Sequence, residues 1–256
     1  MVAGSRWLHR LADIILGVSI AAQRHTTVAP RDGARHGWVR TALRWIGLVL
    51  GGLWLLAALM LIALRWVNPP TTAVHAERRV QAWISGKPYH MRYEYVPLNR
   101  ISPDLQHAVI AAEDARFYQH HGFDWHQIRL DAGEDMDGGR LRGASTLDQQ
   151  LVKNLFFGTE RSIVRKAAVA SLVPVAEVAL GKRRILELYL NEVEWGPGVY
   201  GAEAACVYWD HTSARAIDRD DAARLAAILP APRRWHPQRM GRYSGIIEAR
   251  MAQMGW

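Results

Sequence analysis

One acidic side chain interrupts an otherwise apolar helical stripe. The stripe consists of Leu105, Val109, Glu113, Phe117 and His120, which recur at helical spacing and should share one face. Burial raises the pKa of a carboxyl group, and a carboxylate that titrates near neutrality suits general base catalysis. A structural ion pair between Glu113 and Arg116 fits the spacing equally well, so the pattern alone leaves both readings open.

A polar cluster follows in residues 143–154. On a helix, a hydroxyl, three amides and an ammonium group gather on the face opposite three leucines. The polar residues are Thr146, Gln149, Gln150, Lys153 and Asn154. A helix start of this kind suits a phosphate or a sugar, although a solvated amphipathic helix has the same pattern. Thr146 with Gln149, or Ser145 with Asp148, is expected to form a capping box.

Other local signals place the elements that carry these groups. Ser102 should cap a helix with Pro103 at its first position, and Ser162 should cap the helix of Arg165 and Lys166. Pro174 should interrupt that second helix.

Two further segments are expected to be less regular. Tyr93–Pro97 predicts a short strand at the edge of a sheet, because proline has no N–H to donate to a neighbouring strand. The acidic-then-basic run Asp131–Arg142 predicts a solvated loop.

The first part of the chain predicts a membrane anchor. Trp45–Leu64 contains 20 residues without a charge, about the length that crosses a bilayer as a helix. Residues 1–44 hold seven arginines and two aspartates, and so contribute +5 of the net charge of +8. The positive-inside rule therefore places them in the cytoplasm and the later residues outside. The remainder is only mildly basic, which argues against nucleic-acid binding, and the single Cys206 excludes an internal disulfide.

Five segments, in order, resemble the motifs of the peptidoglycan glycosyltransferases (glycosyltransferase family 51). The first is residues 112–124, Ala-Glu-Asp-Ala-Arg-Phe-Tyr-Gln-His-His-Gly-Phe-Asp. The others are residues 143–154, 161–169, 182–205 and 225–232, so the resemblance covers about residues 70–250. One such motif alone is weak evidence, whereas five in the correct order indicate membership of the family.

The resemblance implies a role for each matching residue. Glu113 matches the catalytic base, which deprotonates the acceptor's 4-hydroxyl so that it attacks the donor sugar with inversion. The implied substrate-binding residues are Ser145, Thr146, Gln149, Gln150, Lys153, Asn154, Arg161, Arg165 and Lys166. In the motif of residues 182–205, Asn191 and Glu192 are expected to brace the cleft.

The resemblance also implies an architecture: a mainly α, lysozyme-like glycosyltransferase domain with a small jaw lobe, preceded by one transmembrane helix. We expect a cytoplasmic tail (1–44), the transmembrane helix (45–65), a linker and membrane-proximal region (66–100) and the glycosyltransferase domain (101–256). The layout resembles that of the family's monofunctional members, in the bacterial inner membrane with a periplasmic catalytic domain.

The implied substrates are lipid II and the nascent glycan strand. The implied leaving group is undecaprenyl pyrophosphate. No cofactor is expected to be required; Mg²⁺ is a candidate only at the pyrophosphate, since no residue pattern reads as a metal cage. Cell-division or elongation proteins are candidate partners that the sequence does not identify.

Two positions depart from the family pattern. Asp148 replaces a hydroxyl residue, and its helical angle places it away from the polar face. Val169 stands where the family has its second essential glutamate. Val169 supports an alternative, a catalytically impaired lipid II-binding or scaffold protein. A lytic glycoside-cleaving enzyme is a further alternative, but the basic cleft argues against it.

Overall fold

The computed structural model describes residues 32–136, 145–160 and 162–256. The chain divides into two compact units, residues 1–51 and 52–256. The first described helix, α2 (Asp32–Ala63), contributes to both. Within the described residues, one stretch is long and apolar enough to cross a membrane, Trp38–Ala63, with a mean hydropathy of 2.5. This candidate span starts seven residues before the predicted one and includes Arg40 and Arg44, whose long side chains can reach an interface from within a helix.

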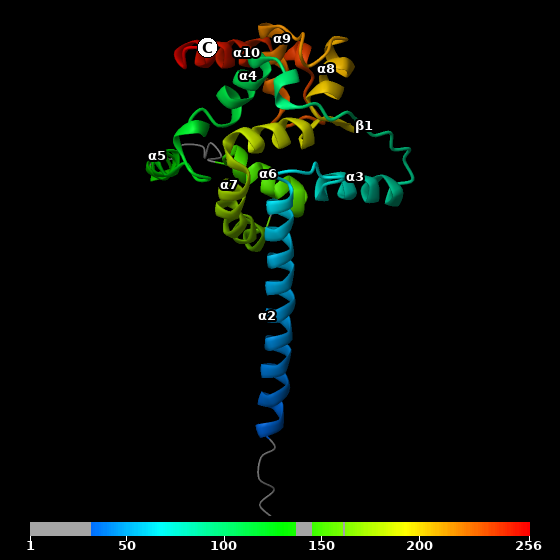
Figure 1. The fold of residues 1–256 in the computed structure, drawn as a ribbon, viewed down its shortest axis with the longest axis vertical. Helices are drawn as coiled ribbons and strands as arrows, with labels where there is room; N and C mark the ends of the chain where they lie inside the picture. Colours follow the sequence, from blue (N-terminus) through cyan, green and yellow to red (C-terminus); the bar gives the residue numbers. More distant parts are fainter. Residues whose placement is uncertain (1–31, 137–144, 161) are drawn as a thin grey trace, which may run out of the picture. The chain divides into compact units, whose positions relative to one another are not determined.

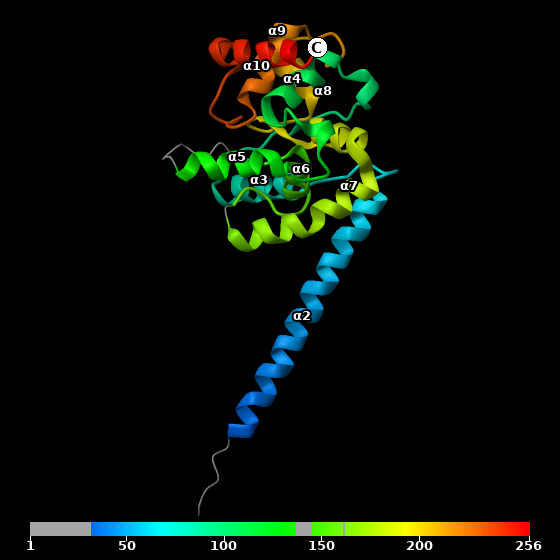
Figure 2. The same ribbon diagram turned by 90° about the vertical axis from the view of Figure 1, so that its left-hand side faces the viewer.

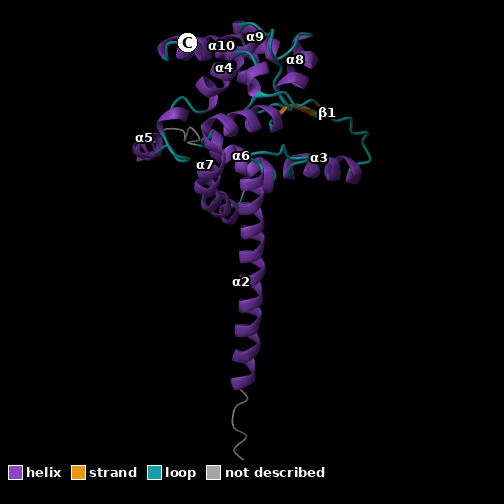
Figure 3. Ribbon diagram, in the orientation of Figure 1, coloured by secondary structure: helices purple, strands orange, loops and turns teal. Residues whose placement is uncertain are grey.

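The second unit is mainly helical, as predicted (Figure 3). Helices α4 (Pro103–Glu113), α9 (Arg219–Ile228) and α10 (Gly241–Gln253) pack on one another, and α6 (Leu147–Phe156) packs along α7 (Ile163–Glu192). Figure 2 shows the first group at the top of the view and the second group below it. The remaining elements are α3 (Ala73–Ile84), α5 (Trp125–Met136), α8 (Ala202–Asp210) and the short 3₁₀ helices Leu98–Arg100, Phe117–Gln119 and Pro237–Arg239. A continuous apolar core joins α4, α6, α7 and α9.

A small sheet ties the chain before α4 to the end of α7 (Figure 1). Its order is β1 (Arg92–Tyr93), β3 (Val199–Tyr200), β2 (Glu194–Gly196), with β1 parallel and β2 antiparallel to β3. The predicted strand is therefore at an edge, but it covers residues 92–93 instead of 93–97. The reason lies at Val96, whose N–H and C=O both bond the Asn191 side chain, at 2.9 Å each. Backbone groups that pair with a side chain are not available to a ladder.

The turn between β2 and β3 and the start of α8 require glycine. Gly198 (φ 76°) and Gly201 (φ 82°) have left-handed backbones. A Cβ at Gly198 would lie 2.6 Å from the His90 carbonyl oxygen, and one at Gly201 would lie 2.8 Å from that of Asn191. Any side chain at either position would collide with backbone.

Three local predictions need correction. Helix α4 starts as predicted, with Ser102 as its N-cap, but ends at Glu113, so the helical stripe does not continue to Phe117 and His120. The predicted loop of residues 131–142 is helical up to Met136, the end of α5, and residues 137–142 lie outside the described part. Helix α7 continues through Pro174, and its non-helical residue is Gly181 (φ 68°, ψ 164°). A glycine adopts that conformation without a steric penalty, which explains why the break falls there.

Candidate active site

The end of α4 and the start of α6 meet through polar contacts that fix both. The Asp114 carboxylate, just after α4, accepts a hydrogen bond from the Leu147 N–H at 2.9 Å, which satisfies the first N–H of α6. Thr146 is the N-cap, as predicted: its hydroxyl accepts from the Gln149 N–H (3.3 Å) and donates to the Gly122 carbonyl (2.7 Å). The α4 terminus is thus held against the positive end of the α6 dipole.

Glu113 is the last residue of α4 and points toward α6. Its carboxylate accepts a hydrogen bond from the Gln150 amide at 2.8 Å, and the Gln150 carbonyl accepts one from the Tyr189 hydroxyl at 3.1 Å. Burial raises the pKa of Glu113, while the Gln150 hydrogen bond and the Lys153 charge act in the opposite direction. The alternative of an ion pair with Arg116 is wrong, because the Arg116 guanidinium pairs with Asp124 at 3.2 Å. Glu113 therefore has the environment that a general base requires.

A pocket of about 220 Å³ opens beside Glu113. Its walls come from the end of α4, the residues after it, the start of α6 and α10, and include Ser145 and Thr146. Arg250 of α10 also lines it and donates a hydrogen bond to the Ala111 carbonyl at 3.3 Å. Sequence reasoning missed Arg250, which lies beyond the last motif and has no local pattern that separates it from surface arginines.

The predicted substrate-binding residues take different positions. Ser145 and Thr146 line the pocket, Gln150 contacts Glu113, and Lys153 is close enough to lower its pKa. Gln149 is partly exposed, whereas Asn154 is buried. Three basic residues remain, Arg161, Arg165 and Lys166.

These basic residues are placed at the start of α7 or just before it. Arg165 donates to the Gly158 carbonyl at 3.3 Å, and Lys166 is exposed. Neither lines the pocket that contains Glu113. Arg161 lies outside the described residues. The structure thus unites Ser145, Thr146, Gln150 and Lys153 around Glu113, and keeps Arg165 and Lys166 at a separate position.

Val169 belongs to the hydrophobic core, with 8% of its surface exposed. Ser162 caps α7 as predicted, through a 3.5 Å hydrogen bond from the Arg165 N–H. Glu177, the next acidic residue along α7, does not stand in for the missing glutamate in this pocket. Its carboxylate lies 3.1 Å from the Lys182 ammonium and 3.7 Å from His121.

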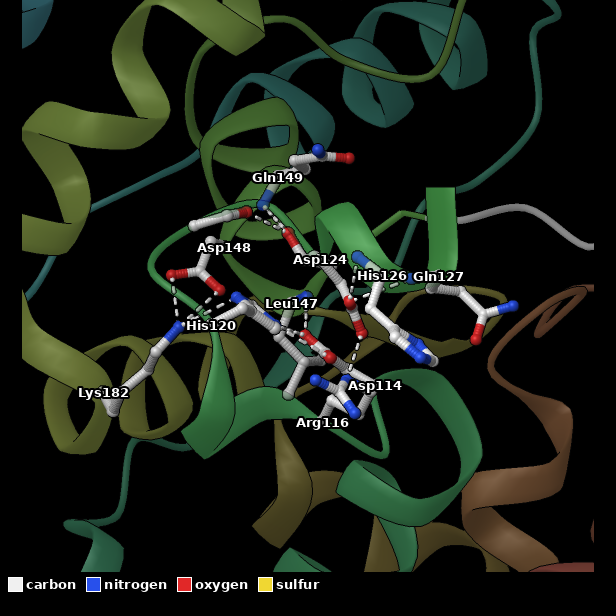
Figure 4. Close-up of polar contacts among 12 residues, drawn as sticks. Asp114, Arg116, His120, Asp124, His126, Gln127, Leu147, Asp148, Gln149 and Lys182 are labelled. Carbon is white, nitrogen blue, oxygen red and sulfur yellow. Dashed lines mark hydrogen bonds and ion pairs between the residues drawn. The ribbon is translucent and has the colours of Figure 1, made fainter. Parts of the chain in front are cut away.

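A buried charge cluster lies behind the α4–α6 junction (Figure 4). The His120 Nε2 is 3.0 Å from both oxygens of Asp114, and the Lys182 ammonium is 3.4 Å from Nδ1 of the same ring. Because an ammonium can only donate, Nδ1 is the acceptor and Nε2 carries the proton that His120 donates to Asp114. Lys182 also lies 3.2 Å from both oxygens of Asp148, which is fully buried. Burial, with Glu177 nearby, raises the pKa of Asp148, and Lys182 opposes that rise.

The donor atoms of Asp114, His120 and Asp148 lie within 4.8 Å of one another and form the described group most like a metal site. Divalent Mg²⁺ prefers an octahedral set of oxygens with several waters. Here the Lys182 ammonium already contacts Asp148 and the His120 ring, so the cluster contains its own cation. These residues do not fit Mg²⁺.

The asparagine and glutamate that end α7 have structural contacts. Asn191 is fully buried and holds Val96 through both backbone groups. Glu192 accepts a hydrogen bond from the Tyr93 hydroxyl at 2.7 Å. Both residues therefore brace the segment before α4 against α7.

Comparison with known proteins identifies the fold family. The sequence model of the family described as Transglycosylase matches residues 79–254. The chain belongs to this transglycosylase family. It is 42% identical to the biosynthetic peptidoglycan transglycosylase of Ectopseudomonas mendocina (strain ymp) over 221 residues, which is 85% of this chain and 91% of that protein.

Two further relatives support the same assignment. Proteins with the same name from Pseudomonas putida (strain W619) and Pseudomonas syringae pv. syringae (strain B728a) are each 44% identical. The first alignment covers 77% of this chain and 85% of the relative, and the second covers 79% and 89%. Membership of the family confirms the predicted lysozyme-like glycosyltransferase domain. These comparisons support neither an impaired scaffold protein nor a lytic enzyme.

Proposed function

We propose that this transglycosylase polymerises lipid II into glycan strands and releases undecaprenyl pyrophosphate with inversion at the anomeric carbon. The observation that carries the proposal is the position of Glu113, at a pocket beside the start of α6, with a raised pKa and a hydrogen bond from Gln150. The names and high coverage of the relatives support the same substrate class.

In this mechanism Glu113 takes the proton from the acceptor's 4-hydroxyl as the oxygen attacks the donor sugar. A base works best when its pKa lies near the working pH, and burial moves the pKa of Glu113 in that direction. Gln150 fixes the carboxylate by its amide, and Ser145 lies where it can bond a sugar hydroxyl.

The leaving pyrophosphate needs positive charge. Lys153, Arg161, Arg165 and Lys166 are the candidates to stabilise it, since preorganised cations act most strongly where charge develops. We propose that no cofactor is required, and that any Mg²⁺ is bound through the pyrophosphate oxygens rather than by a protein cage. Substrate alone then brings the metal to the site.

The substrate's lipid tail gives the apolar helix a function. The span Trp38–Ala63 would anchor the chain in the inner membrane with its catalytic domain in the periplasm, beside the membrane that holds lipid II. A reporter that is active only in the periplasm should work when fused after Trp256, and a cytoplasm-restricted reporter should not. The opposite pair of results would contradict the orientation. Cell-division or elongation proteins are proposed partners in that compartment.

Turnover of lipid II by purified full-length protein tests the activity. Glu113→Gln should lower the rate by about 10²–10⁴-fold, the range for loss of a positioned general base. Glu160→Gln removes an exposed carboxylate outside the pocket and should leave the rate unchanged. Equal rates for wild type and Glu113→Gln would refute the assignment of the base.

A further inference from the structure

Helix α3 (Ala73–Ile84) precedes every segment that carries the proposed chemistry, and it packs against α6 (Figure 1). Its N-cap is Thr72, whose hydroxyl accepts a hydrogen bond from the His75 N–H at 3.1 Å. Nε of Arg78 donates to Glu194 of β2 at 3.0 Å, so the helix is also tied to the small sheet. Helix α3 is therefore a fixed support from which a side chain can hold a neighbouring segment.

Glu77 of this helix holds the turn between α6 and α7. Its Oε2 accepts a hydrogen bond from the Thr159 N–H at 2.6 Å, and its Oε1 accepts one from the Thr159 hydroxyl. The Gln81 amide donates to Oε1 at 2.8 Å and so orients the carboxylate. Burial acts to raise the pKa of Glu77, but the hydrogen bonds from Thr159, with Arg78 and Gln81, lower this pKa overall. Glu77 thus binds the turn as an anion.

The conformation of the turn leaves space for this carboxylate. Gly158 has a left-handed backbone (φ 68°), which a glycine adopts without a steric penalty. A Cβ at this position would overlap Oε2 of Glu77. The carboxylate therefore occupies the space that a side chain at position 158 would need.

One peptide group connects Glu77 to a basic residue of α7. The Gly158 carbonyl and the Thr159 N–H belong to the same planar peptide group and point in opposite directions. The N–H donates to Glu77, and the carbonyl accepts a hydrogen bond from the Arg165 guanidinium at 3.3 Å. A rotation of this peptide group that broke the bond to Glu77 would also turn the carbonyl away from Arg165.

The contact with the carbonyl orients Arg165 without using up the guanidinium. A guanidinium has five N–H donors, and this hydrogen bond takes one of them. A cation that is already held in place binds a phosphate more tightly than one that must first be ordered, because less conformational entropy is lost.

We propose that Glu77 is a positioning residue for the glycosyl transfer. Through the peptide group between Gly158 and Thr159, it fixes the guanidinium of Arg165 where that group meets the pyrophosphate of the donor. Because Arg165 is assigned to the pyrophosphate there, this inference rests on the proposed function. A purely structural role of Glu77 would instead give a loss that is the same with or without Arg165.

The first experiment tests the contact without substrate, by hydrogen exchange and mass spectrometry of the full-length protein in detergent. Glu77→Ala removes the acceptor of the Thr159 N–H, so this amide should exchange at least about tenfold faster. Glu94→Ala removes an exposed carboxylate just after β1 and should leave the exchange unchanged. Equal exchange in wild type and Glu77→Ala would overturn the inference.

The second experiment measures binding of undecaprenyl pyrophosphate to the same proteins in a double-mutant cycle. Arg165→Ala should weaken binding about tenfold, the usual loss for a charge-assisted contact. Glu77→Ala should weaken it about three- to tenfold in the wild type, but less than about twofold in the Arg165→Ala background. Glu77→Gln keeps an oxygen acceptor for the Thr159 N–H and should lose less affinity than Glu77→Ala, whereas Glu94→Ala should bind like wild type.

The two variants separate the possible failures. An equal loss from Glu77→Ala in both backgrounds would overturn the inference, because Glu77 would then act independently of Arg165. If Arg165→Ala weakens binding and Glu77→Ala does not, the inference alone is wrong. If Arg165→Ala itself binds like wild type, the pyrophosphate role of Arg165 is wrong, and the inference falls with that part of the proposed function.

Discussion

Replacing Gln150 by leucine tests the link between structure and catalysis most directly. The Gln150 amide donates to the Glu113 carboxylate at 2.8 Å and so stabilises its ionised form. A hydrogen bond to a charged group contributes about 1.5–3 kcal/mol. Because 1.36 kcal/mol corresponds to one pKa unit, loss of this hydrogen bond should move the acid limb of the pH profile of kcat/KM to higher pH, by roughly one to two pH units.

The direction of this pH shift follows from the role of Glu113 as a base. Glu113 must be deprotonated to act, so the rate falls as pH drops through its pKa. Burial already raises this pKa, and the Gln150 hydrogen bond opposes that rise, so removing the bond raises the pKa further. The assay is lipid II polymerisation by full-length protein across a pH series, with kcat/KM measured at each pH.

A neighbouring residue provides the control. Gln149 is on the same helix, but the groups that act on the pKa of Glu113 are Gln150, Lys153 and Asp114, so Gln149→Leu should leave the acid limb in place. Tyr189→Phe removes only the bond that holds the Gln150 carbonyl, and should move the limb less than Gln150→Leu does. An unmoved limb in Gln150→Leu, or an equal shift in Gln149→Leu, would refute the reasoning.

Two more substitutions address stability and substrate contact. Lys182→Met should destabilise the protein by about 3–5 kcal/mol, because it leaves the buried Asp148 without its cation, and the loss should shrink in an Asp148→Asn background. Thermal unfolding should detect a decrease of roughly 6–20 °C, given about 2–4 °C per kcal/mol for a domain of this size; a change no larger than that of Arg239→Gln would contradict it. Arg250→Gln should lower kcat/KM about tenfold with little change in unfolding temperature, because it removes one of the two guanidinium groups that line the pocket, together with its hydrogen bond to the Ala111 carbonyl; unchanged kinetics would exclude this role.

Local sequence signals predicted the elements of the site well. Serine and threonine before a helix start gave the correct caps at Ser102, Thr146 and Ser162, since a side-chain oxygen there bonds an otherwise unpaired N–H. The leucine face of α6 is buried as its periodicity required. Such features depend on residues a few positions apart, and a sequence displays them directly.

Contacts between distant segments escaped prediction. The end of α4 at Glu113 follows from Asp114 bonding the Leu147 N–H, 33 residues later. The resemblance implies that Gln150 binds the substrate; the structure adds that its amide donates to Glu113 and its carbonyl accepts from Tyr189. Thr146 likewise bonds the Gly122 carbonyl. Each of these residues has the predicted type and location, yet its partner is set by tertiary packing that no spacing rule encodes.

The position of Glu113 also depends on Asp148, which lies on the opposite face of α6. Side chains two positions apart in a helix are rotated by about 200° around its axis, so Asp148 and Gln150 face in nearly opposite directions. Gln150 holds Glu113 on one side, and on the other Asp148 bonds the Lys182 ammonium in the core. A rotation of α6 that loosened one contact would therefore disturb the other. Aspartate at this position is thus more than a tolerated replacement for a hydroxyl residue, because its ion pair with Lys182 holds the helix whose Gln150 bonds Glu113, the carboxylate that we propose as the base.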